Sequence, residues 1–215
     1  MLVLPILATL CVYPFMASLI ARGRRPAATL AALLWAASLS AAIIAATRRD
    51  PAMMGGIVLH GPAYRDEMFA FVRSGAGRES DPFQFVPQHL LHLLVFASLS
   101  IVSGGALGIL LGAVLVGYMS YYVGSLAAAG GAPATALLYG WPPYAILRVV
   151  AFVILGVCLS EPLLLRLRRR STGSPSPAAR RPYYLAAALL LLADLIIKWL
   201  CAPAWAALLR PCLGS

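Results

Sequence analysis

Charged residues are scarce in this chain of 215 residues. They make up 11% of it, while apolar residues make up 61%, whereas a soluble domain carries about a quarter charged residues and about half apolar ones. A soluble globular domain is therefore excluded, because the excess apolar surface needs a bilayer to accept it. Acidic residues are scarcer still, with seven Asp and Glu against 17 Lys and Arg. No basic run is interleaved with aromatic residues, as a nucleic-acid groove would require, so we expect no nucleic-acid partner.

The motifs of common soluble enzymes are absent as well. The chain has no Walker A sequence, no Gly-x-Gly-x-x-Gly turn, no His-Glu-x-x-His helix and no Gly-x-Ser-x-Gly elbow. It also has no Cys-x-x-Cys pair and no internal repeat of the kind found in transporters with inverted halves. These absences argue against nucleotide-driven transport by this chain alone and against the familiar hydrolase mechanisms.

Long apolar runs predict an all-α fold, a polytopic integral membrane helical bundle. A helix needs about 20 mostly apolar residues to cross a bilayer. The first run is followed by three Arg instead of being preceded by positive charge, so we expect a retained span and not a cleaved signal. We expect residues 1–215 to form a single transmembrane domain with six spans, at 2–20, 27–46, 86–102, 105–128, 143–165 and 183–204.

The third and fourth spans are inferred from one stretch, residues 86–129. These 44 residues contain no Asp, Glu, Lys or Arg, and their length is about twice what one helix places in a bilayer. The break near the middle is Ser103-Gly104-Gly105, so we expect two helices joined by a tight hairpin. Gly104, Gly108 and Gly112 recur at four-residue intervals. Such a stripe lets another helix approach closely, either within the chain or in a second copy.

The distribution of Lys and Arg predicts the orientation. The loop between the first two spans carries three Arg, and the basic loop 166–181 carries six. The positive-inside rule places both loops in the cytoplasm. Both termini and the segment 47–85 then face outward, and the five Arg of that segment are balanced by five acidic residues. We expect a multi-pass protein of the inner (plasma) membrane of a bacterial-type cell.

The outward segment 47–85 contains an amphipathic pattern. Apolar residues from Tyr64 to Val72 recur at helical spacing. The helix that they predict either lies flat on the outer membrane surface, which we favour, or covers the ends of the spans as a lid. Asp66 and Glu67 point to different sides of such a helix. Glu67 lies closer to the apolar stripe, so it is the better candidate for a site.

Two histidines open the third span. His89 and His92 have the i, i+3 spacing that places both imidazoles on one helix face. Two such side chains can ligate a divalent metal, or one can act as a general base while the other orients a substrate. A metal site needs a third ligand, and Glu67, Asp81 and His60 lie on the same expected side. The alternative is a pair of interfacial histidines hydrated by water and lipid headgroups.

Three further charged residues lie within the spans, two of them, Arg148 and Lys198, in the outer half of the bilayer and Asp194 near its middle. Arg148 is just inside the outer end of the fifth span, and Asp194 and Lys198 have the i, i+4 spacing of a structural ion pair, which is the role that we expect for them. Ionisable residues at membrane depth are costly and usually face the bundle interior or a wet cavity. Their shared depth with His89 and His92 predicts a polar cavity between the third, fifth and sixth spans.

Other polar residues are expected to have structural roles. Glu161, in the inner half of the fifth span, should pair with a snorkelling arginine such as Arg166 or Arg168. Cys201 and Cys212 are both expected outside, where a disulfide would persist, although their spacing alone does not establish one. An aromatic belt at the outer membrane interface is expected from five residues: Tyr118, Tyr121, Tyr122, Trp141 and Tyr144.

One leading hypothesis and two alternatives follow. The first is a membrane enzyme, a hydrolase or transferase, that acts on a membrane-held lipid, lipoprotein or peptide near the outer face. His89 or His92 would be its general base or metal ligand, Glu67 would assist, and Arg148 would offset developing negative charge. The second is a non-catalytic subunit or assembly factor of a larger membrane complex, favoured by the glycine stripe and the missing motifs. The third is a small-anion carrier that uses Arg148 and Lys198.

Overall fold

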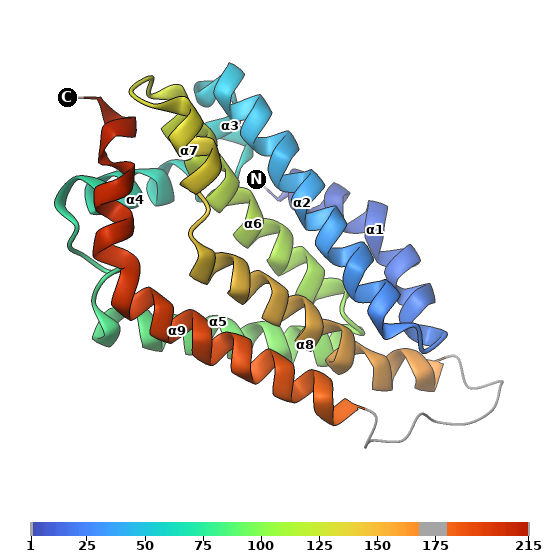
Figure 1. The fold of residues 1–215 in the computed structure, drawn as a ribbon. Coiled ribbons are helices and arrows are strands. Elements are labelled where there is room, and N and C mark those ends of the chain that lie inside the picture. Colours follow the sequence, from blue (N-terminus) through green and yellow to red (C-terminus); the bar gives the residue numbers. More distant parts are fainter. Residues whose placement is uncertain (1, 168–179, 215) are drawn as a thin grey trace.

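The computed structural model describes residues 2–167 and 180–214, and this part of the chain is almost entirely helical, with no strand among the described residues. Figure 1 shows the helices packed into one bundle. In chain order they are α1 (Val3–Ala21), α2 (Arg25–Arg49), α3 (Pro51–Ile57), α4 (Gly61–Ser74), α5 (Pro82–Ser103), α6 (Ala106–Ala128), α7 (Pro133–Tyr139), α8 (Pro143–Leu167), α9 (Arg181–Leu209) and the short 3₁₀ helix η2 (Arg210–Leu213).

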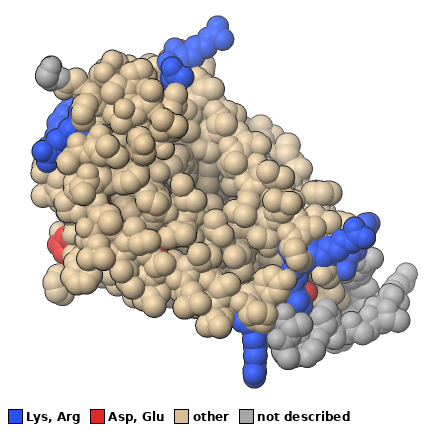
Figure 2. Space-filling view, in the orientation of Figure 1, with Lys and Arg blue, Asp and Glu red and all other residues tan. Residues whose placement is uncertain are grey.

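Six helical segments of the described residues are long and apolar enough to cross a membrane. They contain α1, α2, α5, α6, α8 and α9, so the expected all-α polytopic bundle is confirmed. Figure 2 shows the Lys and Arg side chains of one face gathered towards its ends, with a broad, almost uncharged band between them. Such a band suits contact with lipid hydrocarbon. Most of the predicted basic loop, including Arg168, lies outside the described residues.

The hairpin between α5 and α6 forms at the expected break. Gly104 and Gly105 both have left-handed backbone angles, with φ of 60° and 95°, a region that glycine adopts without the strain that a Cβ would introduce. The Gly105 amide donates to the Ser100 carbonyl at 2.9 Å, and the Leu107 amide donates to the Ser103 hydroxyl at 2.9 Å. These bonds cap both helix ends, so two glycines suffice to reverse the chain.

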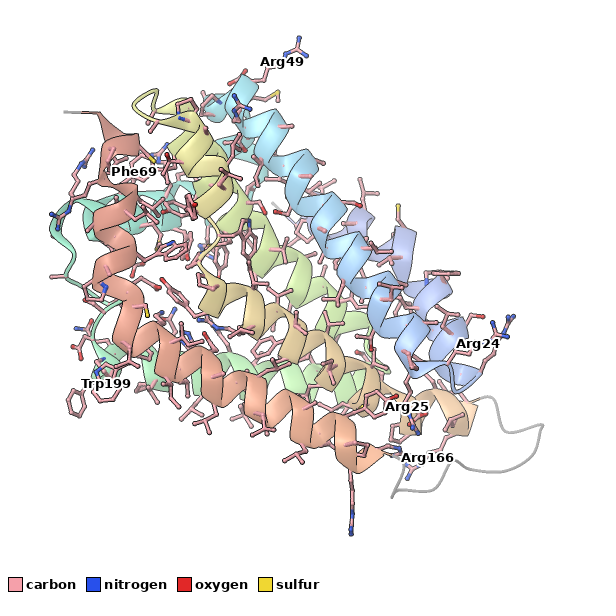
Figure 3. All side chains as sticks on the ribbon, viewed as in Figure 1. Arg24, Arg25, Arg49, Phe69, Arg166 and Trp199 are labelled. Carbon is pink, nitrogen blue, oxygen red and sulfur yellow. The ribbon has the colours of Figure 1, made fainter. Side chains whose placement is uncertain are left out.

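The two ends of the bundle are covered differently. What we call the α4 end carries the short helices α3, α4, α7 and η2, and the chain's C-terminus lies there (Figure 1). The opposite end, which we call the basic end, carries the α1–α2 turn, the end of α8 and the start of α9. Figure 3 places Arg49 towards the α4 end, and Arg24, Arg25 and Arg166 at the basic end.

Helix α4 is part of the core and does not lie flat on a surface. It begins with a proline in its first turn and ends at Gly75, whose φ is 72°. Its apolar face buries Met68, Phe71 and Val72 in the core cluster that it shares with α6, α7, α9 and η2. The surface-helix interpretation favoured from the sequence is therefore wrong, because this face packs on protein. The lid interpretation is the one that the structure supports.

Helix α9 bends where Pro203 interrupts it. Proline removes one helical hydrogen bond and crowds the preceding turn, and the red helix of Figure 1 changes direction in this region. The bend turns η2 towards α4, where the Arg210 Nε donates to the Val72 carbonyl at 3.3 Å.

The two cysteines at this end of the chain are not bridged. Cys212 is buried, Cys201 is exposed, and both are free thiols.

Two glycines near the start of α6 allow close packing within the chain: Gly108 of the stripe, and Gly105, which precedes the helix and is not part of the stripe. A Cβ on Gly108 would overlap the hydroxyl of Ser100 on α5, and a Cβ on Gly105 would overlap that of Ser160 on α8. These glycines therefore permit close helix packing. Gly112 differs, because a Cβ there would meet no atom within 4 Å. Within the stripe, Gly108 therefore serves close packing, whereas Gly112 borders open space.

Candidate functional site

A polar cavity lies beneath α4, between α5, α6 and α8. Its volume is about 90 Å³. Apolar residues such as Met68, Met119 and Phe152 form part of its wall. The polar side chains that line it are Tyr64, Glu79, His92, Tyr118, Trp141, Tyr144 and Arg148. They come from α4, the loop after α4, α5, α6 and the α7–α8 region, so segments far apart in the sequence meet at one point.

Arg148 is held in this cavity by Asp194 of α9. Its Nε and one terminal nitrogen donate to the two carboxylate oxygens at 2.8 and 2.9 Å. The aspartate is almost fully buried, whereas the arginine side chain keeps 23% exposure. The expected pair between Asp194 and Lys198 is therefore wrong. A guanidinium fork matches a carboxylate in two places, which a lysine four residues away on the same helix cannot do.

Lys198 is paired with Glu79, a residue of the loop between α4 and α5. Their Nζ and Oε2 atoms are 2.7 Å apart, and the lysine side chain is only 1% exposed. The Nζ also lies 4.8 Å from the centre of the Phe85 ring. A buried ammonium needs such a partner, because an isolated charge at this depth would cost several kcal/mol. The loop after α4 therefore folds inward to supply the carboxylate.

The two ion pairs give the site a balanced charge. Two cations, Arg148 and Lys198, face two carboxylates, Asp194 and Glu79. Burying such pairs contributes little to stability compared with apolar packing of the same volume. Ionisable groups gathered around a cavity inside an apolar bundle instead mark a candidate functional site.

Tyr64 brings a hydroxyl from α4 to the cavity wall. Its ring lies 4.5 Å from the ring of Tyr118, measured between centroids, and its hydroxyl donates to the Met119 sulfur at 3.2 Å. Burial raises the pKa of Tyr64 well above its ordinary value, and the negative charge of Glu79 adds to this effect. The hydroxyl therefore stays protonated at neutral pH and remains a hydrogen-bond donor.

Two further donors at the cavity lack partners among the described residues. They are the hydroxyl of Tyr144, a side chain that is 2% exposed, and the indole nitrogen of Trp141. An unpaired buried donor costs free energy, so a molecule in the cavity that carries acceptor oxygens would be stabilised.

The aromatic belt expected at the interface is wrong for Tyr121, Tyr122 and Tyr144, which are all buried in the bundle.

The two histidines of α5 have different positions. His92 lines the polar cavity. His89 is absent from its lining, packs its ring 5.6 Å from that of Phe85, and has no hydrogen-bond partner for either nitrogen within the described residues. Those residues hold no group of three His, Cys, Asp or Glu suited to a metal ion. The donor set of the described residues does not fit the divalent metal considered from the sequence.

Glu67 does not reach the cavity. Its side chain is 40% exposed on α4, where it lies 3.5 Å from Arg78. The carboxylate at the site is Glu79, which sequence reasoning missed. The available signal was Lys198: a lysine buried in a span needs an acidic partner, and the acidic residues of segment 47–85 were the ones free to supply it. Sequence spacing could not tell which of them would fold inward.

A second buried charge cluster lies at the basic end. The carboxylate of Glu161 is fully buried and accepts hydrogen bonds from the Nε and a terminal nitrogen of Arg25 at 3.0–3.1 Å. The Arg180 Nε lies 2.8 Å from the same carboxylate. The expected partner Arg166 is therefore wrong, and Arg168 lies outside the described residues. Helix α2 and the segment before α9 meet here, which spacing along α8 could not indicate.

Comparisons of this chain with protein-family models, curated proteins and solved structures find no match.

Proposed function

We propose that this chain is a membrane enzyme, a hydrolase or transferase, that acts on a membrane-held substrate in the polar cavity. The observation that carries the proposal is the gathering of His92, Glu79 and Arg148 around one cavity within the helical bundle. A bundle that needed only stability would fill this space with apolar side chains, because buried ion pairs are a poor source of stability. The charged groups are better explained by the chemistry that they allow.

His92 is the general base of the proposed reaction. An imidazole is the side chain best suited to accept and return a proton near neutral pH. It would take the proton from an attacking water or hydroxyl and return it to the leaving group, while the bond between that group and a carbonyl or phosphoryl centre breaks. His89, which packs beside Phe85 outside the cavity lining, would act only by positioning its neighbours.

Arg148 stabilises the negative charge that develops on the reacting oxygen. It uses two of its five N–H donors on Asp194, so the others can face the cavity. The bidentate contact fixes the guanidinium plane, and a donor fixed in advance needs no reorganisation during the reaction. Glu79 takes the place that the sequence suggested for Glu67. It orients Lys198 and adds an acceptor to the cavity wall.

The α4 end would face the outside of the inner membrane. The positive-inside rule supports this orientation, because Arg24, Arg25 and Arg166 lie at the basic end. The substrate would then enter from the outer leaflet, with α4 covering the site as a lid. The alternative, a non-catalytic subunit of a larger complex, would leave the polar cavity without a role.

The test is to follow lipid chemistry in a defined membrane. The full chain is placed in nanodiscs made from a bacterial polar-lipid extract, and mass spectrometry follows new lipid species over time. We expect products with the wild-type chain and a loss of about 10²–10⁴-fold in rate for His92→Ala, the usual contribution of a general base.

The matched control is His60→Asn. His60 is exposed at the start of α4 with a φ of 59°, a conformation that asparagine tolerates. This variant removes an imidazole away from the cavity, and its rate should equal that of the wild type. Lipids left unchanged by the wild-type chain, or a rate equally affected by both substitutions, would contradict the proposed function. Stoichiometric co-purification with a partner protein would then favour the subunit alternative.

A further inference from the structure

A second, apolar cavity lies beside the polar one. It sits between α1, α2, α5, α6 and α8, and its volume is about 90 Å³. Its walls are formed mainly by aliphatic and aromatic side chains, among them Met16, Trp35, Ile109 and Val153, and by the glycines of α6. A water-sized group needs about 10–15 Å³ of such space, so the cavity has room for several methylene-sized groups.

The two cavities are adjacent and share part of their walls. Leu115 and Val116 of α6, with Val149 and Phe152 of α8, line both. On one side of these four residues the wall is hydrocarbon, and on the other it carries Arg148, His92 and unpaired donors. A molecule that occupied both spaces would need an apolar chain attached to a group rich in acceptor oxygens.

Gly112 is the feature that close helix packing does not explain. A glycine inside a helix is less favourable than an alanine, and at Gly108 the contact with Ser100 accounts for the glycine. At Gly112 a Cβ would meet nothing within 4 Å, and the residue lines the apolar cavity. Any side chain at position 112 would occupy part of the apolar cavity, and glycine leaves that part open.

We propose that the two cavities together bind one phospholipid, with part of one acyl chain beside Gly112 and the headgroup oxygens at Arg148, Tyr144 and Trp141. This inference rests on the proposed function and names the class of its substrate. The balanced charges of the polar cavity suit a zwitterionic headgroup better than one with net charge. The ester and phosphate oxygens satisfy the donors that have no partner among the described residues.

Native mass spectrometry of the detergent-solubilised full chain tests the proposal, with palmitoyl-oleoyl phosphatidylethanolamine as the added lipid. The wild-type chain should bind one molecule. Gly112→Leu fills the apolar cavity and should weaken binding at least tenfold. Gly56→Leu is the matched control, because Gly56 is also a helical glycine with open space around it, is exposed on α3, and does not line either cavity. It should bind as the wild type does.

If Gly112→Leu fails to fold, photo-crosslinking of the wild-type chain tests whether an acyl chain occupies the apolar cavity. A phospholipid with a diazirine on its acyl chain should label the stretches of α6 and α8 that contain Leu115 and Val149. Equal binding by the wild type and Gly112→Leu, or labelling confined to lipid-exposed residues such as Leu94 and Leu189, would overturn the proposal. His92→Ala should still bind the lipid, so loss of turnover and loss of binding are separately measurable.

Discussion

The two ends of the bundle bury charge in different ways. At the basic end, Glu161 is enclosed by Arg25 and Arg180, so the carboxylate is saturated with donors. At the α4 end, two ion pairs stand around a cavity that also presents donors without partners among the described residues. Buried charge alone therefore does not identify a functional site. The combination of buried charge, open space and unsatisfied donors is what separates the two ends.

The largest effect is expected at the basic end. Glu161→Gln keeps the shape of the side chain but removes the charge that Arg25 and Arg180 share. Breaking a buried ion pair in this way costs about 3–5 kcal/mol, so thermal unfolding in detergent should show a strongly destabilised protein. Arg166→Gln, at an exposed position, is the control and should unfold like the wild type. If Glu161→Gln were as stable as Arg166→Gln, the cluster would have no structural role.

A somewhat smaller loss is expected at the α4 end. Glu79→Gln leaves Lys198 buried without its carboxylate, and we expect about 3 kcal/mol of destabilisation, the lower part of the range for a broken buried pair. Glu67→Gln breaks an exposed pair with Arg78 and should cost less than about 1 kcal/mol. Denaturant unfolding of the two variants measures the difference. Equal losses would mean that Glu79 is not the residue that neutralises Lys198.

The smallest effects separate the two kinds of glycine on α6. Gly108→Ala should destabilise by about 1–3 kcal/mol, because its Cβ overlaps the Ser100 hydroxyl. Gly112→Ala should stabilise by about 0.5–1 kcal/mol, since alanine is the better helix former and the space is open. Thermal unfolding shows the sign of each change, and adding Ser100→Ala to Gly108→Ala should recover part of the loss. The changes in stability of Gly108→Ala and Gly112→Ala should have opposite signs. If both variants were destabilised, or both stabilised, the difference between a packing glycine and a cavity glycine would be refuted.

The helical architecture was predictable because membrane spans are recognised from the hydropathy of consecutive residues, without knowledge of contacts between helices. The six spans follow from apolar runs of sufficient length, and the α5–α6 hairpin follows from the glycines at 104 and 105, whose left-handed backbone the structure confirms. The expectation of one polar cavity holds for His92 and Arg148, which line it, but not for His89. The cavity was also expected between the third, fifth and sixth spans, whereas no residue of α9 lines it and α6 takes that place. These inferences required only length, composition and spacing within one helix.

The partners of the charged residues were not predictable, because they depend on contacts between helices. Spacing along α9 favoured a pair between Asp194 and Lys198, whereas the structure joins them to Arg148 and Glu79. The periodicity of α4 showed that one face is apolar but not whether lipid or protein covers it. Lys198 indicated that an acidic partner was needed, but the sequence did not show that Glu79 is the residue that folds inward to supply it.

The most direct test of the account is an experimental structure of the full chain in nanodiscs that contain phosphatidylethanolamine. If the two cavities bind one phospholipid, one elongated density should run from the guanidinium of Arg148, past the wall formed by Val149 and Leu115, to the open space at Gly112. Side chains closed over an empty apolar cavity, with lipid density only on the outer faces of the helices, would contradict it.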